Sequence, residues 1–147
     1  MNNSPPVGFA NQGSDPGSNF ARNLGMVVVE RGPGRATIEV EVTDRLTHAG
    51  GSGHGGLVSA LLDVTLAMAA ALPREDEQDP DLFSVTLSLT SSFLAPAPLG
   101  RLVCSGWQTG GGRKTVFCEG RVEDAAGTLV ATAQGVFRLV PWPTGST

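Results

Sequence analysis

Polar and apolar residues alternate strictly between Arg35 and Thr43. The apolar members of this run are Ala36, Ile38, Val40 and Val42, and the polar members are Thr37, Glu39 and Glu41. A period of two is typical of a strand with one buried face, so the run predicts a half-exposed antiparallel strand. Gly25–Glu30 predicts another strand just before it, joined through a turn at Arg31–Gly34.

The segment from His54 to Leu72 has a different pattern, because it is apolar on nearly every side. Between Leu57 and Leu72 its only polar side chains are Ser59, Asp63 and Thr65. A helix of this kind is normally buried, and Pro73 predicts its end. A carboxylate is rarely buried without a partner or a task. Asp63 is therefore either a structural carboxylate bonded to Ser59, Thr65 or a neighbouring strand, or a nucleophile or general base.

Four more strands are predicted after this helix, and a short helix precedes the first strand. The strands are Ser84–Leu94, Arg101–Gln108, Lys114–Glu123 and Thr128–Val140, and the short helix is Asn19–Leu24. Two strands, one oily helix and four strands predict an α+β architecture in which an antiparallel sheet wraps around a central helix. The sequence holds neither βαβ repeats nor a glycine motif for dinucleotides or phosphate loops.

The chain is long enough for one domain with a proper core. We place that domain at residues 19–140. Residues 1–18 are rich in Asn, Gly, Ser and Pro and predict a disordered leader, and residues 141–147 predict a loose tail. Residues 74–81 are acidic, contain a proline and predict an exposed connection.

The charge pattern excludes several classes of partner. The net charge is −4, and the few Lys and Arg residues are scattered, so we expect no nucleic-acid partner. The longest apolar stretch, about sixteen residues, is interrupted by Asp63, which argues against a membrane span. The first residues do not follow the pattern of a secretory signal. We therefore expect a cytoplasmic protein.

Two cysteines, Cys104 and Cys118, are too few for a disulfide framework. If Gly110–Gly112 is the turn of a hairpin, its midpoint places the two cysteines roughly opposite each other. The simplest interpretation is a pair of small buried thiols in a reducing compartment.

The start of the long helix is the first candidate for chemistry. The first amides of a helix lack internal acceptors and carry the positive end of its dipole. Gly55 and Gly56 have no side chains, so a polarised carbonyl could approach their N–H groups closely. The alternative is that both glycines only form a tight junction between loop and helix.

Other polar residues give weaker signals. His48 and His54 are the only histidines and have no companion at metal-ligand spacing, so we predict neither a metal site nor a cofactor. His54 is better explained as a residue that organises the loop than as a base. No Gly-x-Ser-x-Gly motif supplies a serine nucleophile. Arg113 and Lys114 follow bare amides and either hold a phosphate or are simply solvated.

Several short motifs occur together in a specific order. His54-Gly55-Gly56 is followed by Asp63, nine residues after the histidine. The supporting motifs are Leu24-Gly25-Met26, Phe93-Leu94-Ala95-Pro96-Ala97 and Gly127-Thr128-Leu129-Val130-Ala131. In this order and spacing the chain resembles the hotdog-fold acyl-CoA thioesterases, particularly the phenylacetate-degradation (PaaI-like) type. The resemblance covers roughly Phe20 to Val140.

The resemblance implies a hotdog fold and hydrolysis of an acyl- or aryl-CoA thioester to a free acid and coenzyme A. It also implies homodimers, often paired into homotetramers, with active sites at the dimer interface. By position, Asp63 matches the catalytic carboxylate and Gly55 the amide that polarises the thioester carbonyl. Thr86 falls where a neighbouring subunit often supplies a hydroxyl. The residues expected to contact the substrate are His54, Gly56, Ser59, Arg113 and Lys114.

One residue departs from the family pattern. Six residues before His54, the family commonly carries Asn or Gln, which orients the thioester or the water, and this chain has His48. Imidazole donates or accepts hydrogen bonds and titrates near neutral pH, so we expect His48 to line the site and to alter the activity. The sequence does not decide whether Asp63 attacks directly or deprotonates water. The rival functions are an acyl-CoA-binding hotdog protein without hydrolysis and, less favoured, an acyl dehydratase or hydratase.

Overall fold

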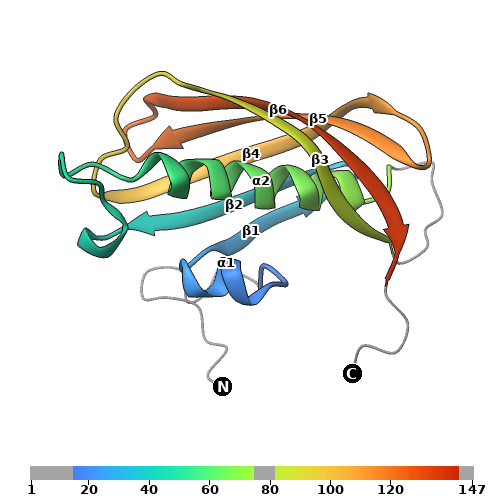
Figure 1. Cartoon of the computed structure of the whole chain (residues 1–147), viewed down its shortest axis with the longest axis horizontal. Coiled ribbons are helices and arrows are strands. Elements are labelled where there is room, and N and C mark those ends of the chain that lie inside the picture. Colours follow the sequence, from blue (N-terminus) through green and yellow to red (C-terminus); the bar gives the residue numbers. More distant parts are fainter. Residues whose placement is uncertain (1–14, 75–81, 143–147) are drawn as a thin grey trace.

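In the described part of the chain, six antiparallel strands form one sheet that curls around a single long helix (Figure 1). The computed structural model describes residues 15–74 and 82–142. Its elements are α1 (Asn19–Asn23), β1 (Val27–Gly32), β2 (Arg35–Val42), a 3-10 turn (Asp44–Leu46), α2 (Gly55–Ala71), β3 (Leu82–Phe93), β4 (Gly100–Gly111), β5 (Thr115–Asp124) and β6 (Leu129–Pro141). The strand order is β1-β2-β4-β5-β6-β3.

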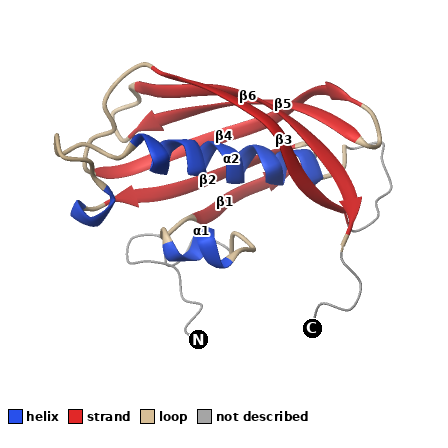
Figure 2. Cartoon of the chain, in the orientation of Figure 1, coloured by secondary structure: helices blue, strands red, loops and turns tan. Residues whose placement is uncertain are grey.

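The predicted architecture is confirmed, with α2 lying along one face of the sheet (Figure 2). The leader, the connection after Arg74 and the tail lie largely outside the described residues. The structure does describe the end of the leader, where Asp15 pairs with Arg22 and the Ser18 hydroxyl caps α1. It also describes Trp142, whose ring packs against that of Phe83. No helix in the described part of the chain is long and apolar enough to cross a membrane.

Three glycines of the sheet allow α2 to approach closely. Gly106, Gly120 and Gly135 lie on neighbouring strands under Leu66. A Cβ atom at Gly120 would lie 2.3 Å from the Leu66 Cδ1 atom and one at Gly106 would lie 3.1 Å from it. Because interiors are packed to crystal density, side chains at these positions would push the helix outward. The glycines therefore help to set the height of α2 above the sheet.

The C-terminal end of α2 is held by one side chain from β4. The Gln108 Nε2 group donates to the carbonyl oxygens of Ala69 at 2.9 Å and Leu72 at 3.0 Å. These carbonyls belong to the last turn, where helical carbonyls lack internal partners. Gln108 thus fixes the helix end against the sheet.

The predicted burial of β2 is confirmed for the residues of its inner face. For one residue of the outer face, the predicted exposure is wrong. The four apolar residues from Ala36 to Val42 are buried against the core. Glu39, expected to be exposed, is only 5% exposed and pairs with Arg101. Its cross-strand neighbours are Val27 and Val103, so flanking strands cover this carboxylate from both sides.

The two cysteines are free and buried, but they do not face each other. Cys104 pairs with Val122, and Cys118 pairs with Gln108. The expected pairing is wrong because the turn comes later than the triple glycine, whereas the register shift between Gln108 and Gly110 changes the pairing by only one residue. The Gly112 N–H donates to the Thr115 carbonyl at 2.8 Å, which closes the turn through Arg113 and Lys114.

We expect both thiols to be inert in the folded protein. Burial raises the pKa of Cys104 and of Cys118 to about 12, so both remain protonated at neutral pH, and the thiolate is the reactive form. Ellman's reagent should find almost no fast-reacting thiol in the native protein, and two per chain after unfolding without reductant. A rapid native reaction, or fewer than two thiols after unfolding, would contradict this assignment.

Candidate active site

The first turn of α2 leaves a single amide without an acceptor. His54 is the N-cap, and its Nδ1 atom accepts from the Gly56 N–H at 2.8 Å. The His54 carbonyl accepts from the N–H groups of Leu57 at 2.9 Å and Val58 at 3.2 Å. The Gly55 N–H has no acceptor in the described part of the chain. The cap therefore uses the Gly56 amide and leaves that of Gly55 free for a ligand.

The space around Gly55 is open. A Cβ atom built at Gly55 would meet only Phe93, with its Cε1 atom at 3.9 Å. A cavity of about 500 Å³ lies here. One wall is polar and consists of His48, Ser52, Gly53 and Gly55. The other wall is mostly apolar and consists of Val58, residues 93–97 and Val130. The cavity thus combines a free amide with a surface suited to an apolar group.

The loop before α2 is tied together by His48. Its Nδ1 atom accepts from the Gly50 N–H at 2.8 Å, and its Nε2 atom lies 2.6 Å from the Ser52 Oγ atom. The backbone N–H of His48 donates to the Ser52 carbonyl at 2.9 Å, and its carbonyl accepts from Gly51. His48 lines the cavity, and both of its ring nitrogens are engaged within the loop.

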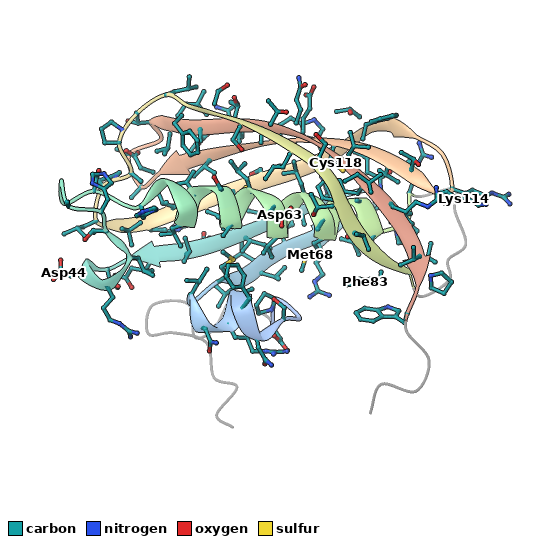
Figure 3. All side chains as sticks on the ribbon, viewed as in Figure 1. Asp44, Asp63, Met68, Phe83, Lys114 and Cys118 are labelled. Atoms are coloured by element: carbon teal, nitrogen blue, oxygen red, sulfur yellow. The ribbon has the colours of Figure 1, made fainter. Side chains whose placement is uncertain are left out.

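Asp63 lies near the middle of α2, where β3 passes beside the helix (Figure 3). Its carboxylate is half-buried, and its Oδ1 atom accepts a hydrogen bond from the Thr86 hydroxyl at 2.7 Å. The Thr65 hydroxyl instead donates to the Leu61 carbonyl. Among the described residues Asp63 therefore has a partner on a neighbouring strand and none on its own helix.

Thr86 was expected to serve the site of a neighbouring subunit, and here it reaches the carboxylate of its own chain. The reason is the position of β3, which pairs with β6 and passes close to α2. One turn further along the helix, the Ser84 hydroxyl donates to the Ala67 carbonyl at 2.7 Å. These two bonds hold Asp63 and β3 at a fixed distance.

One side of α2 is not fully covered by its own sheet. The half-buried residues at helical spacing are Ser59, Ala60, Asp63, Val64, Ala67 and Met68. The positions between them, including Leu61, Leu62 and Leu66, are fully buried. Gly55, Ser59 and Asp63 are four residues apart and therefore share this side. We call it the open stripe of α2.

Gly55 and Asp63 of one chain are too far apart to act on the same carbonyl group. They are eight residues apart on one helix, which corresponds to about 12 Å along its axis. An amide must lie about 3 Å from a carbonyl oxygen and a nucleophile about 3 to 3.5 Å from the carbon. A single chain therefore provides two separate halves of a possible site.

The two cations predicted to hold phosphate lie away from the cavity. Arg113 and Lys114 are exposed in the turn between β4 and β5, beyond Gln108 and the C-terminal end of α2. Figure 3 shows Lys114 projecting outward, far along the sheet from Asp63. The structure does not bring these cations together with Gly55 within one chain.

The sequence pattern that defines the thioesterase superfamily matches residues 50–131, which include the free amide and Asp63. The chain belongs to the thioesterase superfamily. Its class of reaction is therefore the hydrolysis of thioesters.

Two relatives of this thioesterase come from distant organisms. An inferred esterase of Saccharolobus solfataricus is 32% identical over 117 residues, which cover 80% of each chain. Human acyl-coenzyme A thioesterase 13 is 35% identical over 83 residues, which cover 56% of each chain.

Solved structures share the same fold. A mutant of the phenylacetic acid degradation protein PaaI from Thermus thermophilus is 28% identical, with a TM-score of 0.71, over 82% of this chain and 99% of that one. PaaI of E. coli is 22% identical, with a TM-score of 0.75, over 84% of this chain and 86% of that one. The predicted family of this thioesterase is confirmed.

One contact of this thioesterase was not anticipated from its sequence. Ser52 lines the cavity and contacts the His48 ring, although it belongs to none of the motifs on which the resemblance rests. The only signal was its position in a glycine-rich loop, two residues before His54. Such a position does not indicate which way a hydroxyl points.

Proposed function

We propose that this thioesterase hydrolyses acyl-CoA or aryl-CoA thioesters at sites formed between two copies of the chain. The observation that carries the proposal is the separation of the free Gly55 amide from the Asp63 carboxylate on the open stripe of α2. If a second α2 lies antiparallel beside the first, the Gly55 amide of one copy approaches Asp63 of the other. Two equivalent sites then arise from one two-fold axis.

The edge of the sheet supports this pairing. β3 ends the strand order, and its outer edge pairs with no strand among the described residues. It carries exposed apolar side chains, with Val85 41% and Leu87 59% exposed. A long apolar edge is an aggregation hazard unless another chain covers it. A second copy that packs along β3 also places its own α2 next to the open stripe of the first. This contact buries the stripe, as expected for a helix that is apolar on nearly every side.

In the proposed reaction, the thioester carbonyl oxygen accepts a hydrogen bond from the Gly55 amide of one copy. The positive end of the helix dipole favours the negative charge that develops on this oxygen. Asp63 of the other copy either attacks the carbonyl carbon to form an anhydride or removes a proton from water that attacks it. The carbon–sulfur bond then breaks and coenzyme A leaves as its thiolate. If Asp63 has attacked directly, water then hydrolyses the anhydride, which releases the free acid and restores the carboxylate. On either route the thiolate takes up the proton that the water loses. Thr86 fixes one carboxylate oxygen, which leaves the other free to react.

The substrate contacts follow from the two walls of the cavity and from the surface charges. We assign the acyl or aryl group to the apolar wall at residues 93–97. His54 and Ser59 flank its path along the open stripe, while Gly56 contributes the cap that holds His54 in place. Arg113 and Lys114, exposed and cationic, are assigned to the phosphates of coenzyme A.

A panel of acyl-CoA and aryl-CoA esters, followed by release of free thiol, tests this function. We expect at least one ester to turn over with a kcat/KM of about 10⁴ M⁻¹s⁻¹ or more. Replacing both Arg113 and Lys114 by Ala should raise KM about three- to tenfold for the CoA ester. The matching N-acetylcysteamine thioester lacks the phosphates, so its KM should change much less.

An inert protein would contradict the proposal, above all if it retained coenzyme A through purification. That outcome would favour the acyl-CoA-binding function without hydrolysis. Equal changes of KM for both thioesters would remove the assignment of Arg113 and Lys114 while leaving hydrolysis intact.

A further inference from the structure

The hydrogen bonds of His48 determine which nitrogen carries the proton. The Gly50 backbone N–H points at Nδ1. An amide is only a donor, so Nδ1 must be an acceptor without a proton. The neutral ring then carries its hydrogen on Nε2, which lies 2.6 Å from the Ser52 Oγ atom.

This tautomer sets the direction of the Ser52 hydroxyl. Because Nε2–H donates, the Ser52 oxygen accepts, and its own hydrogen is free to point elsewhere. Ser52 lines the same cavity as Gly55, on the same polar wall. The loop is held in this arrangement by the pairing of the His48 and Ser52 backbones and by the Gly53 N–H, which donates to Ala97 at 2.7 Å.

We propose that the Ser52 hydroxyl is a catalytic hydrogen-bond donor to the thioester, beside the Gly55 amide, and that His48 is its positioning residue. This inference rests on the proposed thioesterase function. The carbonyl oxygen accepts from Gly55 and from Ser52, so two donors share the charge of the transition state. His48 acts through Ser52 and does not contact the substrate.

The same geometry excludes a serine-protease type of pair. A base that activates serine must accept its proton, but the Nε2 atom of neutral His48 already carries one. Ser52 is therefore a donor to the substrate and not a nucleophile, which leaves the attack to Asp63 or to water.

Nitrogen NMR of the histidine rings tests the positioning part without any substrate. In mildly alkaline buffer, ¹⁵N-labelled His48 should show Nε2 protonated and Nδ1 unprotonated, and a His48→Gln variant assigns its signals against those of His54. A ring protonated on Nδ1 would overturn the role of His48.

Kinetics test the catalytic part. Ser52→Ala should lower kcat about tenfold to a hundredfold, less than the loss of a fully buried oxyanion donor, with KM changed by less than about threefold. Ser52→Thr keeps the hydroxyl and should recover most of the rate. Ser105→Ala is the matched control, since Ser105 is half-buried on the sheet face away from α2, and it should match the wild type.

Substitutions of His48 distinguish action through Ser52 from general support of the loop. His48→Asn keeps an acceptor near Gly50 but is too short to reach Ser52, whereas His48→Gln places an amide N–H where Nε2 was. We expect the His48→Gln variant to retain several times more activity than the His48→Asn variant. In the Ser52→Ala background, His48→Asn should lower kcat no further.

Three outcomes would overturn the inference. If the wild type is active and the kcat of Ser52→Ala lies within twofold of the wild-type value, only the catalytic role of the Ser52 hydroxyl is overturned. If His48→Asn lowers kcat by the same factor in the wild type and in the Ser52→Ala variant, the positioning role of His48 is overturned. A wild type inert on every thioester removes the proposed function and this inference with it.

Discussion

Replacing Asp63 by Asn should abolish nearly all turnover of a good acyl-CoA substrate. We expect kcat to fall about 10²- to 10⁴-fold, the range typical of a lost acid–base or nucleophilic group. Asn keeps the size of Asp and an oxygen that accepts the Thr86 hydrogen bond, so the fold should survive. KM should stay close to that of the wild type, because the carboxylate acts in the transition state.

The matched control is Asp44→Asn, the same chemical change at an exposed residue of the 3-10 turn. It should leave the steady-state rate of thiol release and the melting temperature unchanged. Near-normal turnover of Asp63→Asn would mean that the carboxylate is structural and that its hydrogen bond with Thr86 only holds β3 against α2.

Replacing Gly55 by Pro should remove the oxyanion donor while keeping the helix. Gly55 is the first residue of α2, its N–H has no acceptor in the described chain, and the preceding His54 is extended, with φ −62° and ψ 137°. Proline is favoured at the first helical position and an extended residue before it is compatible. We expect kcat to fall about 10²- to 10³-fold, with circular dichroism and melting temperature nearly unchanged.

Gly55→Ala separates the amide from the side chain. A Cβ atom here has room, with Phe93 at 3.9 Å, and alanine keeps the N–H. The loss with Ala should be far smaller than that with Pro. Equal losses with both would show that the space above Gly55, and not its amide, is what the reaction requires.

Much of this fold follows from local patterns in the sequence. The strict alternation before Thr43 and the oily run after His54 predicted β2 and α2 within a few residues. The lone carboxylate in that run predicted Asp63 as the residue that needs a partner, because charge inside an apolar helix is costly whatever the surrounding fold.

Other features depend on contacts that no local pattern encodes. The register of β4 and β5 depends on a turn that comes at Arg113 and Lys114, after the triple glycine, so the relative position of Cys104 and Cys118 was misjudged. Glu39 is buried because flanking strands cover it. The link from His48 to Ser52 depends on how a glycine-rich loop folds back, and glycine permits many such paths.

Mixing the two inactive variants tests the shared site most directly. When Asp63→Asn and Gly55→Pro chains are denatured together, refolded and allowed to pair at random, half of the pairs contain one chain of each kind. In such a pair, one site carries both substitutions and the other carries neither. The account predicts recovery of about a quarter of the wild-type activity, far above either variant refolded alone. Activity no greater than the average of the two variants would show that each site lies within a single chain, which would contradict the account.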